Sequence, residues 1–110
     1  MNIVEITKAA FIQHRDQQYE DEDMSLCVEE ILYEMERGVQ LHYENYVITF
    51  EKQELPVVDA YVLRVDSQLS TLGHVMIDVE HDSYDGAEIF YDDMYEVEAR
   101  QVMVTRYFKK

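Results

Sequence analysis

The pattern of hydrophobic and polar residues is clearest between Asp23 and Glu51, where a helical period gives way to a period of two. From Met24 to Met35, apolar residues recur every three or four positions while glutamates take the other side, which predicts an amphipathic helix. Gly38 marks its end, because glycine enters a left-handed backbone without a Cβ penalty. The apolar stripe contains Met24, Cys27, Val28, Ile31, Leu32 and Met35.

Beyond Gly38 the polarity alternates residue by residue, as it does in half-buried strands. Two such runs, 39–43 and 46–50, are separated by Glu44 and Asn45, a pair that suits a short turn. The helix is therefore expected to lead directly into a β-hairpin.

The residues before this unit predict a strand and then another helix. The segment from Asn2 to Ile6 is short and rich in β-branched residues, which favours a strand. Thr7 can cap a helix that continues to about Tyr19. The four acids between Tyr19 and Met24 predict a solvated connector to the next helix.

After the hairpin, the pattern predicts a break followed by two strands. The only proline ends the stretch from Gln53 to Pro56, because proline cannot donate a backbone hydrogen bond. Val57 to Val65 is expected to form a strand, and His74 to Glu80 another, joined by the polar segment from Asp66 to Gly73. These two strands are expected to be antiparallel neighbours.

The C-terminal region predicts a short helix and a last strand. Asp85 with Glu88 resembles a capping box, and the apolar spacing that follows favours a helix from Gly86 to Tyr95. Ala99 to Phe108 is expected to be a strand. The predicted order β-α-α-β-β-β-β-α-β indicates one α+β domain over residues 1–110, with a mostly antiparallel sheet.

Charge changes this picture more than any single residue does. The 110 residues include 24 Asp and Glu against nine Lys and Arg, a formal net charge of -15. Residues 16–36 contain nine acids and residues 66–98 ten, and neither stretch contains a basic residue. Such a surface repels nucleic acid and anionic lipid directly and favours a basic protein partner.

The sequence also predicts a cytoplasmic location. No stretch approaches the roughly 18 apolar residues of a membrane span, and the first residues lack the features of a signal peptide. Cys27 is the only cysteine, so no internal disulfide is expected, and its place on the apolar stripe makes it a buried hydrophobe.

No complete metal or catalytic motif is present, and we expect neither a cofactor nor enzyme activity. His81 lies among several acids, but a calcium loop aligned on Gly86 would begin at His81 and end at Asp92, where an acid and a glutamate are required. These residues are interpreted as a loop of solvated acids. No serine or cysteine lies in a nucleophile motif.

The segment HVMIDVEHDSYDGAEIFYDDMYEVEARQVMVTRYFKK resembles the C-terminal portion of GNAT acetyltransferases. Ala87, Phe90 and Tyr91 match the A-x-x-F-Y start of a helix in that family. The resemblance implies an acyl-coenzyme A ligand and a general acid at Tyr91. The chain departs from the family in lacking the glycine-rich pyrophosphate loop, for which it has only DSQLSTLG, and in having Tyr95 and Glu96 where Gly-Phe is usual.

The leading hypothesis is a non-catalytic binding or inhibitor protein whose anionic face engages a basic site on another protein. Carboxylates on a helix lie roughly 5 to 6 Å apart at i+3 and i+4, close enough to imitate successive phosphates, so a nucleic-acid-binding enzyme is one candidate partner. The alternatives are a reduced GNAT-like acyltransferase or acyl-coenzyme A binder, a structural subunit of a larger assembly, and a merely soluble acidic protein. The expected partner-binding residues are Glu30, Glu34, Asp85, Glu88, Tyr91, Asp92, Asp93, Tyr95 and Glu96.

Overall fold

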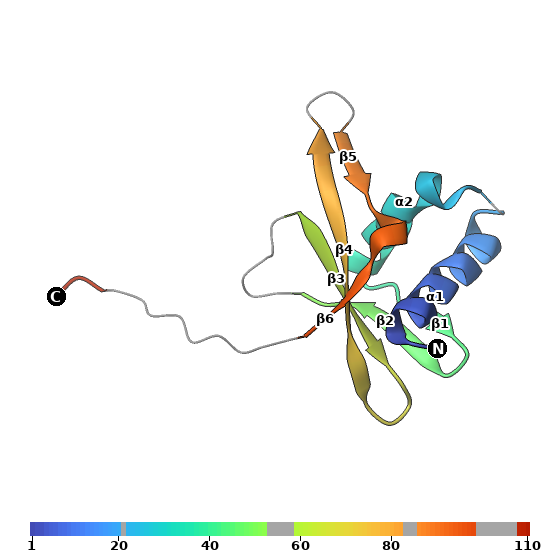
Figure 1. Ribbon diagram of the computed structural model, residues 1–110, viewed down its shortest axis with the longest axis horizontal. Coiled ribbons are helices and arrows are strands. Elements are labelled where there is room, and N and C mark those ends of the chain that lie inside the picture. The colour runs from blue at the N-terminus through green and yellow to red at the C-terminus, as the bar shows by residue number, and fades with distance from the viewer. Residues whose placement is uncertain (21, 53–58, 83–85, 99–107) are drawn as a thin grey trace.

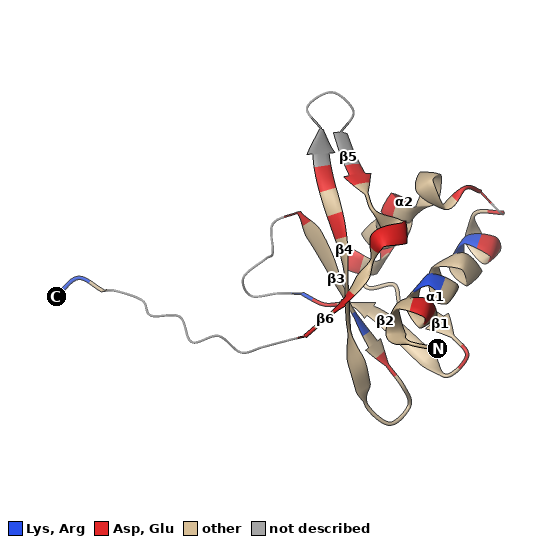
Figure 2. Ribbon diagram, viewed as in Figure 1, with Lys and Arg blue, Asp and Glu red and all other residues tan. Residues whose placement is uncertain are grey.

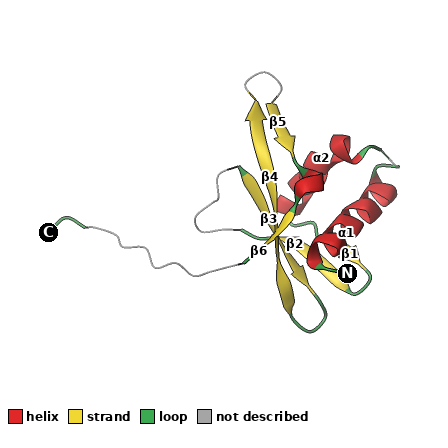
Figure 3. Ribbon diagram, viewed as in Figure 1, coloured by secondary structure: helices red, strands yellow, loops and turns green. Residues whose placement is uncertain are grey.

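The computed structural model describes residues 1–20, 22–52, 59–82, 86–98 and 108–110. In this part of the chain two helices lie on one face of an antiparallel sheet of six strands, an α+β architecture with two layers (Figures 1 and 3). The helices are α1 (Ile3–Gln18) and α2 (Met24–Glu36). The strands are β1 (Leu41–Tyr43), β2 (Tyr46–Phe50), β3 (Ala60–Asp66), β4 (Thr71–Asp82), β5 (Gly86–Ile89) and β6 (Tyr95–Val97).

The sheet is ordered β1-β2-β3-β4-β5, and β6 pairs with the same side of β4 as a second short edge strand (Figure 1). β5 pairs with β4 from Val79 to Asp82, whereas β6 pairs with it from His74 to Met76. Strand β4 therefore runs from the β3–β4 hairpin at one end of the sheet to the β4–β5 hairpin at the other.

The predicted strand from Asn2 to Ile6 is wrong, because α1 begins at Ile3. The Asn2 side chain accepts a hydrogen bond from the backbone N–H of Glu5 at 2.9 Å, which caps the helix before Thr7 is reached. Ile3 and Ile6 then lie on the buried side of the helix. Burial of this apolar face outweighs the modest preference of β-branched residues for strands.

The helix and hairpin that dominate the sequence pattern are confirmed. Asp23 caps α2 by accepting from the N–H of Ser25, and Gly38 ends the turn with φ +109°. β1 and β2 pair across the Glu44-Asn45 turn, with Tyr43 opposite Tyr46. Glu44 adopts φ +51°, as the first residue of a tight hairpin turn requires.

The strands predicted at Val57 to Val65 and His74 to Glu80 are confirmed as antiparallel neighbours over the described residues, as β3 and β4. The segment from Asp66 to Gly73 is a tight hairpin in which β4 already begins at Thr71. Residues 53–58, Asp85 and 99–107 lie outside the described residues. The last of these ranges contains most of the strand predicted from Ala99 to Phe108.

The predicted helix from Gly86 to Tyr95 is wrong. This segment forms β5, one turn of 3₁₀ helix called η1 (Tyr91–Asp93) and β6 (Figure 3). The spacing of Phe90 and Met94 suggested a helix, but the long strand β4 offers unpaired backbone groups along its edge. Pairing with β4 satisfies the N–H and C=O groups of this segment in place of a helix.

The core lies between the two helices and the inner face of the sheet. Phe11 of α1 and Ile31 of α2 are fully buried, together with Ile48, Leu63 and Ile77 from three strands. Each such side chain contributes about 1.5–3 kcal/mol by leaving water. The inner face is thus committed to packing, and the outer face of β4 is left for other uses.

Candidate interaction surface

A row of carboxylates lies on the outer face of β4 and β5. Glu80 and Glu88 stand directly opposite each other in the antiparallel pair, so their side chains project from the same face. Asp78 lies two residues along β4 and shares that face, because strand side chains alternate with a period of two. All three residues are exposed.

Tyr95 extends this row from β6. It is paired with Met76, so it shares the outer face with Asp78. Its hydroxyl donates a hydrogen bond to the Asp78 carboxylate at 2.9 Å. Burial, followed by the hydrogen bond to Asp78, raises the pKa of Tyr95 above its ordinary value. Tyr95 is 40% exposed and remains available for contact.

The 3₁₀ turn η1 lies between β5 and β6 and adds two exposed acids, Asp92 and Asp93. It is held against α1 by a reciprocal pair of hydrogen bonds. The Tyr91 hydroxyl donates to the backbone carbonyl of Lys8 at 3.0 Å, and the Lys8 ammonium donates to the carbonyl of Asp92 at 2.9 Å. The Lys8 ammonium therefore bonds to the main chain of η1.

Tyr91 is an anchor inside the molecule. Its ring packs against Phe11 with centroids 5.7 Å apart, and burial, with a smaller effect of Asp92, raises its pKa to about 12. A tyrosine with this pKa stays protonated at neutral pH, which suits its role as hydrogen-bond donor to Lys8.

We call the group of outer-face and η1 residues the acidic end. In the part of the chain that the structure describes, no ion pair joins its five carboxylates to a Lys, Arg or His. Figure 2 shows acidic positions on β4, β5 and η1 and on the neighbouring helix α2. The acidic end consists of Asp78, Glu80, Glu88, Asp92, Asp93 and Tyr95.

A groove of about 190 Å³ lies on the helical side of the sheet, between α2 and β3. Glu29 and Glu30 of α2 line it together with two tyrosines, Tyr33 and Tyr61. The guanidinium of Arg37 lies over the Tyr33 ring, 5.2 Å from its centroid. Burial and the nearby Glu36 raise the pKa of Tyr61. Carboxylates and aromatic rings together favour a cationic side chain.

Glu34 is engaged within the chain. The Tyr19 hydroxyl donates to one of its oxygens, and His14 Nε2 lies 3.0 Å from the other, joining α1 to α2. Burial opposes ionisation of this carboxyl, but the hydrogen bonds from Tyr19 and His14 outweigh it and lower the pKa of Glu34. Two internal partners leave less of its charge for an external one.

The remaining predicted residues fall in three places. Glu30 lines the groove on α2, whereas Glu96 is exposed on β6 near the base of the β3–β4 hairpin, on the opposite face from Tyr95. Asp85 lies outside the described residues. The predicted set is therefore spread over several places: Glu88 and Tyr95 share the outer face of the sheet, Asp92 and Asp93 are neighbours on η1, and the others lie in the groove, between the helices or at the hairpin base.

Sequence reasoning missed Asp78, Glu80 and the tyrosine pair of the groove. The alternation from His74 to Glu80 contained a usable signal, because it places Asp78 and Glu80 on one face. The pairing of Glu80 with Glu88 required the strand β5, which the sequence pattern presented as a helix.

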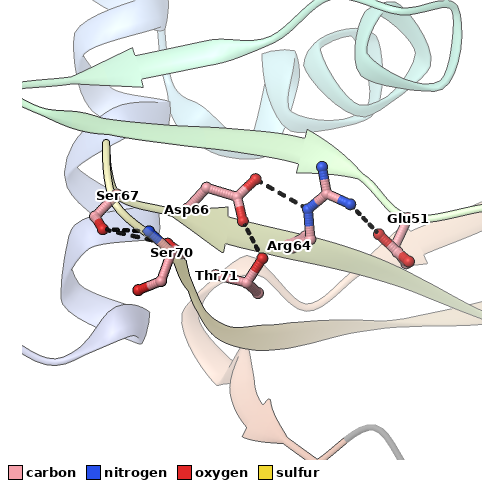
Figure 4. Close-up of polar contacts among 6 residues, drawn as sticks. All are labelled: Glu51, Arg64, Asp66, Ser67, Ser70 and Thr71. Carbon is pink, nitrogen blue, oxygen red and sulfur yellow. Dashed lines mark hydrogen bonds and ion pairs between the residues drawn. The ribbon is translucent and has the colours of Figure 1, made fainter.

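Charges near the β3–β4 hairpin are arranged differently. Arg64 on β3 donates to Asp66 at 2.9 Å and reaches Glu51 at 3.5 Å, and Thr71 donates to the other oxygen of Asp66 at 2.6 Å (Figure 4). Burial opposes ionisation of Asp66, but the hydrogen bonds from Thr71 and Arg64 lower its pKa. These carboxylates have internal partners.

The described residues contain no cluster of three or more His, Cys, Asp or Glu side chains that could hold a metal ion. In the same part of the chain, neither helix is long and apolar enough to cross a membrane. Comparisons of the chain with protein-family models, with curated proteins and with solved structures gave no match. The resemblance to GNAT acetyltransferases therefore stays a prediction.

Proposed function

We propose that this protein is a small acidic binding protein that presents its acidic end to a basic site on another protein. The observation that carries this proposal is the Glu80–Glu88 pair, two exposed carboxylates directly opposite each other and without a basic partner among the described residues. Like charges in this position destabilise a sheet by about 0.2–1 kcal/mol. A cationic partner converts that repulsion into attraction.

The spacing of the row suits an extended basic surface. Asp78 and Glu80 lie about 6 to 7 Å apart along β4, since each strand residue advances about 3.3 Å. Proteins that bind nucleic acid carry rows of Lys and Arg that neutralise successive phosphates. An enzyme of that class is the candidate partner, and the chain would act on it as an inhibitor that occupies the phosphate-binding site.

The groove on α2 supports the same proposal from the other side of the sheet. A lysine or arginine side chain entering between Glu29, Tyr33 and Tyr61 would meet both negative charge and aromatic faces. Tyr95 provides a similar anchor at the acidic end, because tyrosine offers a large, stiff contact area with a polar tip.

The test is affinity capture from a lysate of the source cells, with two variants of equal net charge. One variant carries Asp78→Lys, Glu80→Lys and Glu88→Lys at the acidic end. The control carries Glu5→Lys, Glu20→Lys and Glu44→Lys, three exposed acids outside the acidic end. The wild type and the control are expected to retain a basic protein that the acidic-end variant loses, and retention should fall as salt rises.

Equal losses in the two variants would show that only total charge matters, and capture that is indifferent to salt would remove the electrostatic basis of the proposal. Calorimetry with acetyl-coenzyme A addresses the enzyme alternative. Saturable binding of this ligand would replace the proposed function with that of an acyl-coenzyme A binder.

A further inference from the structure

The groove between α2 and β3 combines two aromatic rings with two carboxylates. Glu29, Glu30 and Tyr33 lie on one side of α2, because residues three and four apart on a helix are neighbours. Tyr61 faces them from β3, on the side of the sheet that carries the helices, since its strand partner Ile77 is fully buried there. A volume of about 190 Å³ lies below the roughly 300–1,000 Å³ of sites that hold a whole small molecule, so the groove suits a single side chain.

The two tyrosines form one fixed wall and one open wall. The Tyr61 ring packs edge-on against Phe50, with centroids 6.3 Å apart, which holds it in place. Tyr33, by contrast, is 52% exposed. A side chain from another molecule can therefore reach the Tyr33 ring from solvent.

The charges around the groove are negative. Burial raises the pKa of Tyr61, and the carboxylates of Glu36 and Glu29 raise it further. Among the described residues, no ion pair joins Glu29 or Glu30 to a Lys, Arg or His. A cation that enters the groove would meet carboxylates whose charge is not already neutralised by such a pair.

The chain itself places a guanidinium over one of these rings. Cζ of Arg37 lies 5.2 Å from the Tyr33 centroid, within the roughly 6 Å over which an aromatic ring attracts a cation. A guanidinium is planar and weakly hydrated, so it stacks on aromatic rings more readily than the strongly hydrated ammonium of lysine. Arg37 is exposed at the end of α2 and does not line the groove, which stays open beside it.

We propose that the groove is an arginine site, in which a guanidinium from another protein lies between the rings of Tyr33 and Tyr61. Glu29 and Glu30 balance its charge. This inference rests on the proposed function for the source of the arginine, which the basic partner supplies. The carboxylates of the acidic end attract lysine and arginine alike, whereas the aromatic walls of the groove distinguish them. The groove thus selects among basic proteins.

An NMR titration of the isotopically labelled full chain tests the proposal. The probes are the N-acetyl, N-methylamide derivatives of arginine, lysine and citrulline, added at constant ionic strength. The arginine probe should shift the ring signals of Tyr33 and Tyr61 saturably. The lysine probe has the same charge and should bind about threefold to tenfold more weakly, and citrulline, the uncharged isostere of arginine, about tenfold or more.

Three outcomes of this titration would overturn the arginine site. One is the absence of a saturable shift with the arginine probe up to about 100 mM, a concentration that populates contacts far weaker than a Kd of 1 mM. Another is citrulline binding as tightly as arginine, which would remove the role of charge. The third is lysine binding as tightly as arginine, which would remove the role of the aromatic walls.

Matched variants separate the contributions of the ring and the carboxylates. Tyr33→Phe keeps an aromatic face and should retain the preference for arginine, whereas Tyr33→Leu keeps only apolar bulk and should lose it. Glu29→Gln with Glu30→Gln should weaken both cationic probes by about threefold to tenfold. Glu5→Gln with Glu44→Gln makes the same change in net charge at exposed positions outside the groove and should change little. Equal effects of the two glutamine pairs, or equal binding by the Phe and Leu variants, would contradict the site.

Failure of the arginine site and failure of the proposed function give different results. If the arginine probe does not bind while capture of a basic protein still depends on salt and on the acidic end, only the arginine site is overturned. If the probe binds as expected but no basic protein is captured, the proposed function is overturned and the groove keeps its selectivity. Where both hold, Tyr33→Leu should retain less of the partner than Tyr33→Phe does, and equal retention would overturn the partner as the source of the arginine.

Discussion

The two ends of strand β4 differ in whether their acidic side chains have partners within the chain. At the β3–β4 end, Asp66 is held by Arg64 and Thr71, and the turn beyond it contains no charge. At the β4–β5 end, Glu80 and Glu88 face each other with no basic residue paired to either in the described part of the chain. Charge supports the fold at the first end and works against it at the second, which points to a use outside the fold.

The largest change in stability should come from a substitution of Gly73, at the β3–β4 end of the strand. Gly73 adopts φ +158°, a backbone conformation that side-chain-bearing residues rarely adopt, so Gly73→Ala is strained, and its Cβ would also lie 2.9 Å from Ile3 Cδ1, which must shift. The expected cost is about 1–3 kcal/mol in the free energy of unfolding, measured in urea. Ile3→Val removes the contacting methyl group, and Gly73→Ala should cost less in that background. Equal costs in both backgrounds would refute the contact.

Asp66→Asn should remove about 1.5 kcal/mol of stability at pH 7, since it discards the charge in the hydrogen bonds with Arg64 and Thr71. The pKa of Asp66 is lowered in the folded state, so its contribution is complete above the unfolded pKa of about 3.9 and disappears as pH falls further. The difference between wild type and variant should therefore shrink between pH 5 and pH 3, two conditions that bracket this pKa. Urea unfolding at both values checks the sign, with Glu44→Gln as a control that changes little.

Tyr91→Phe should cost about 1 kcal/mol, because the Lys8 carbonyl loses its hydrogen bond while the ring keeps its packing against Phe11. Chemical denaturation measures this directly. The same variant bears on the GNAT resemblance, in which Tyr91 would act as general acid. If the variant loses stability but the wild type neither binds nor turns over acetyl-coenzyme A, the role of Tyr91 is structural.

Glu80→Lys should give the smallest change in the free energy of unfolding, and this change should be a gain in stability. A lysine facing Glu88 replaces repulsion with attraction, so the free energy of unfolding should rise by about 0.5 kcal/mol. The double variant Glu80→Lys with Glu88→Lys restores like charges and should lose that gain. Retention of the proposed basic partner should fall in both. A gain in stability together with a loss of binding would show that the acidic end is kept for recognition.

The sequence predicted the middle of the fold well because its signals there are local. The helical repeat of apolar residues stops at Gly38, and a strand-like alternation begins on either side of Glu44. Both α2 and the β1–β2 hairpin therefore follow from neighbouring residues. The start of α1 could have been predicted from local signals, since Ile3, Ile6 and Ala10 recur at helical spacing after the capping residue Asn2.

No local signal of this kind predicts β5. Gly86 to Ile89 form a strand because β4 lies beside them, and the length of β4 is a property of the sheet. The candidate site suffered the same limit. Clustered acids in the sequence indicated a charged surface, but Glu34 binds His14 and Tyr19 from another helix, and Glu80 meets Glu88 across a strand pair. These are contacts between residues that only the folded chain brings together.

The two hydrogen bonds between α1 and η1 have a consequence for binding kinetics. Tyr91 and Lys8 exchange hydrogen bonds with main-chain carbonyls on each other's element, so the segment from β5 to β6 is clamped to the body of the protein before any encounter. Amide protons of this segment should accordingly exchange slowly. If the proposed acidic end is the docking surface, it needs no folding step on contact, and its association rate should approach the limit set by electrostatically guided diffusion.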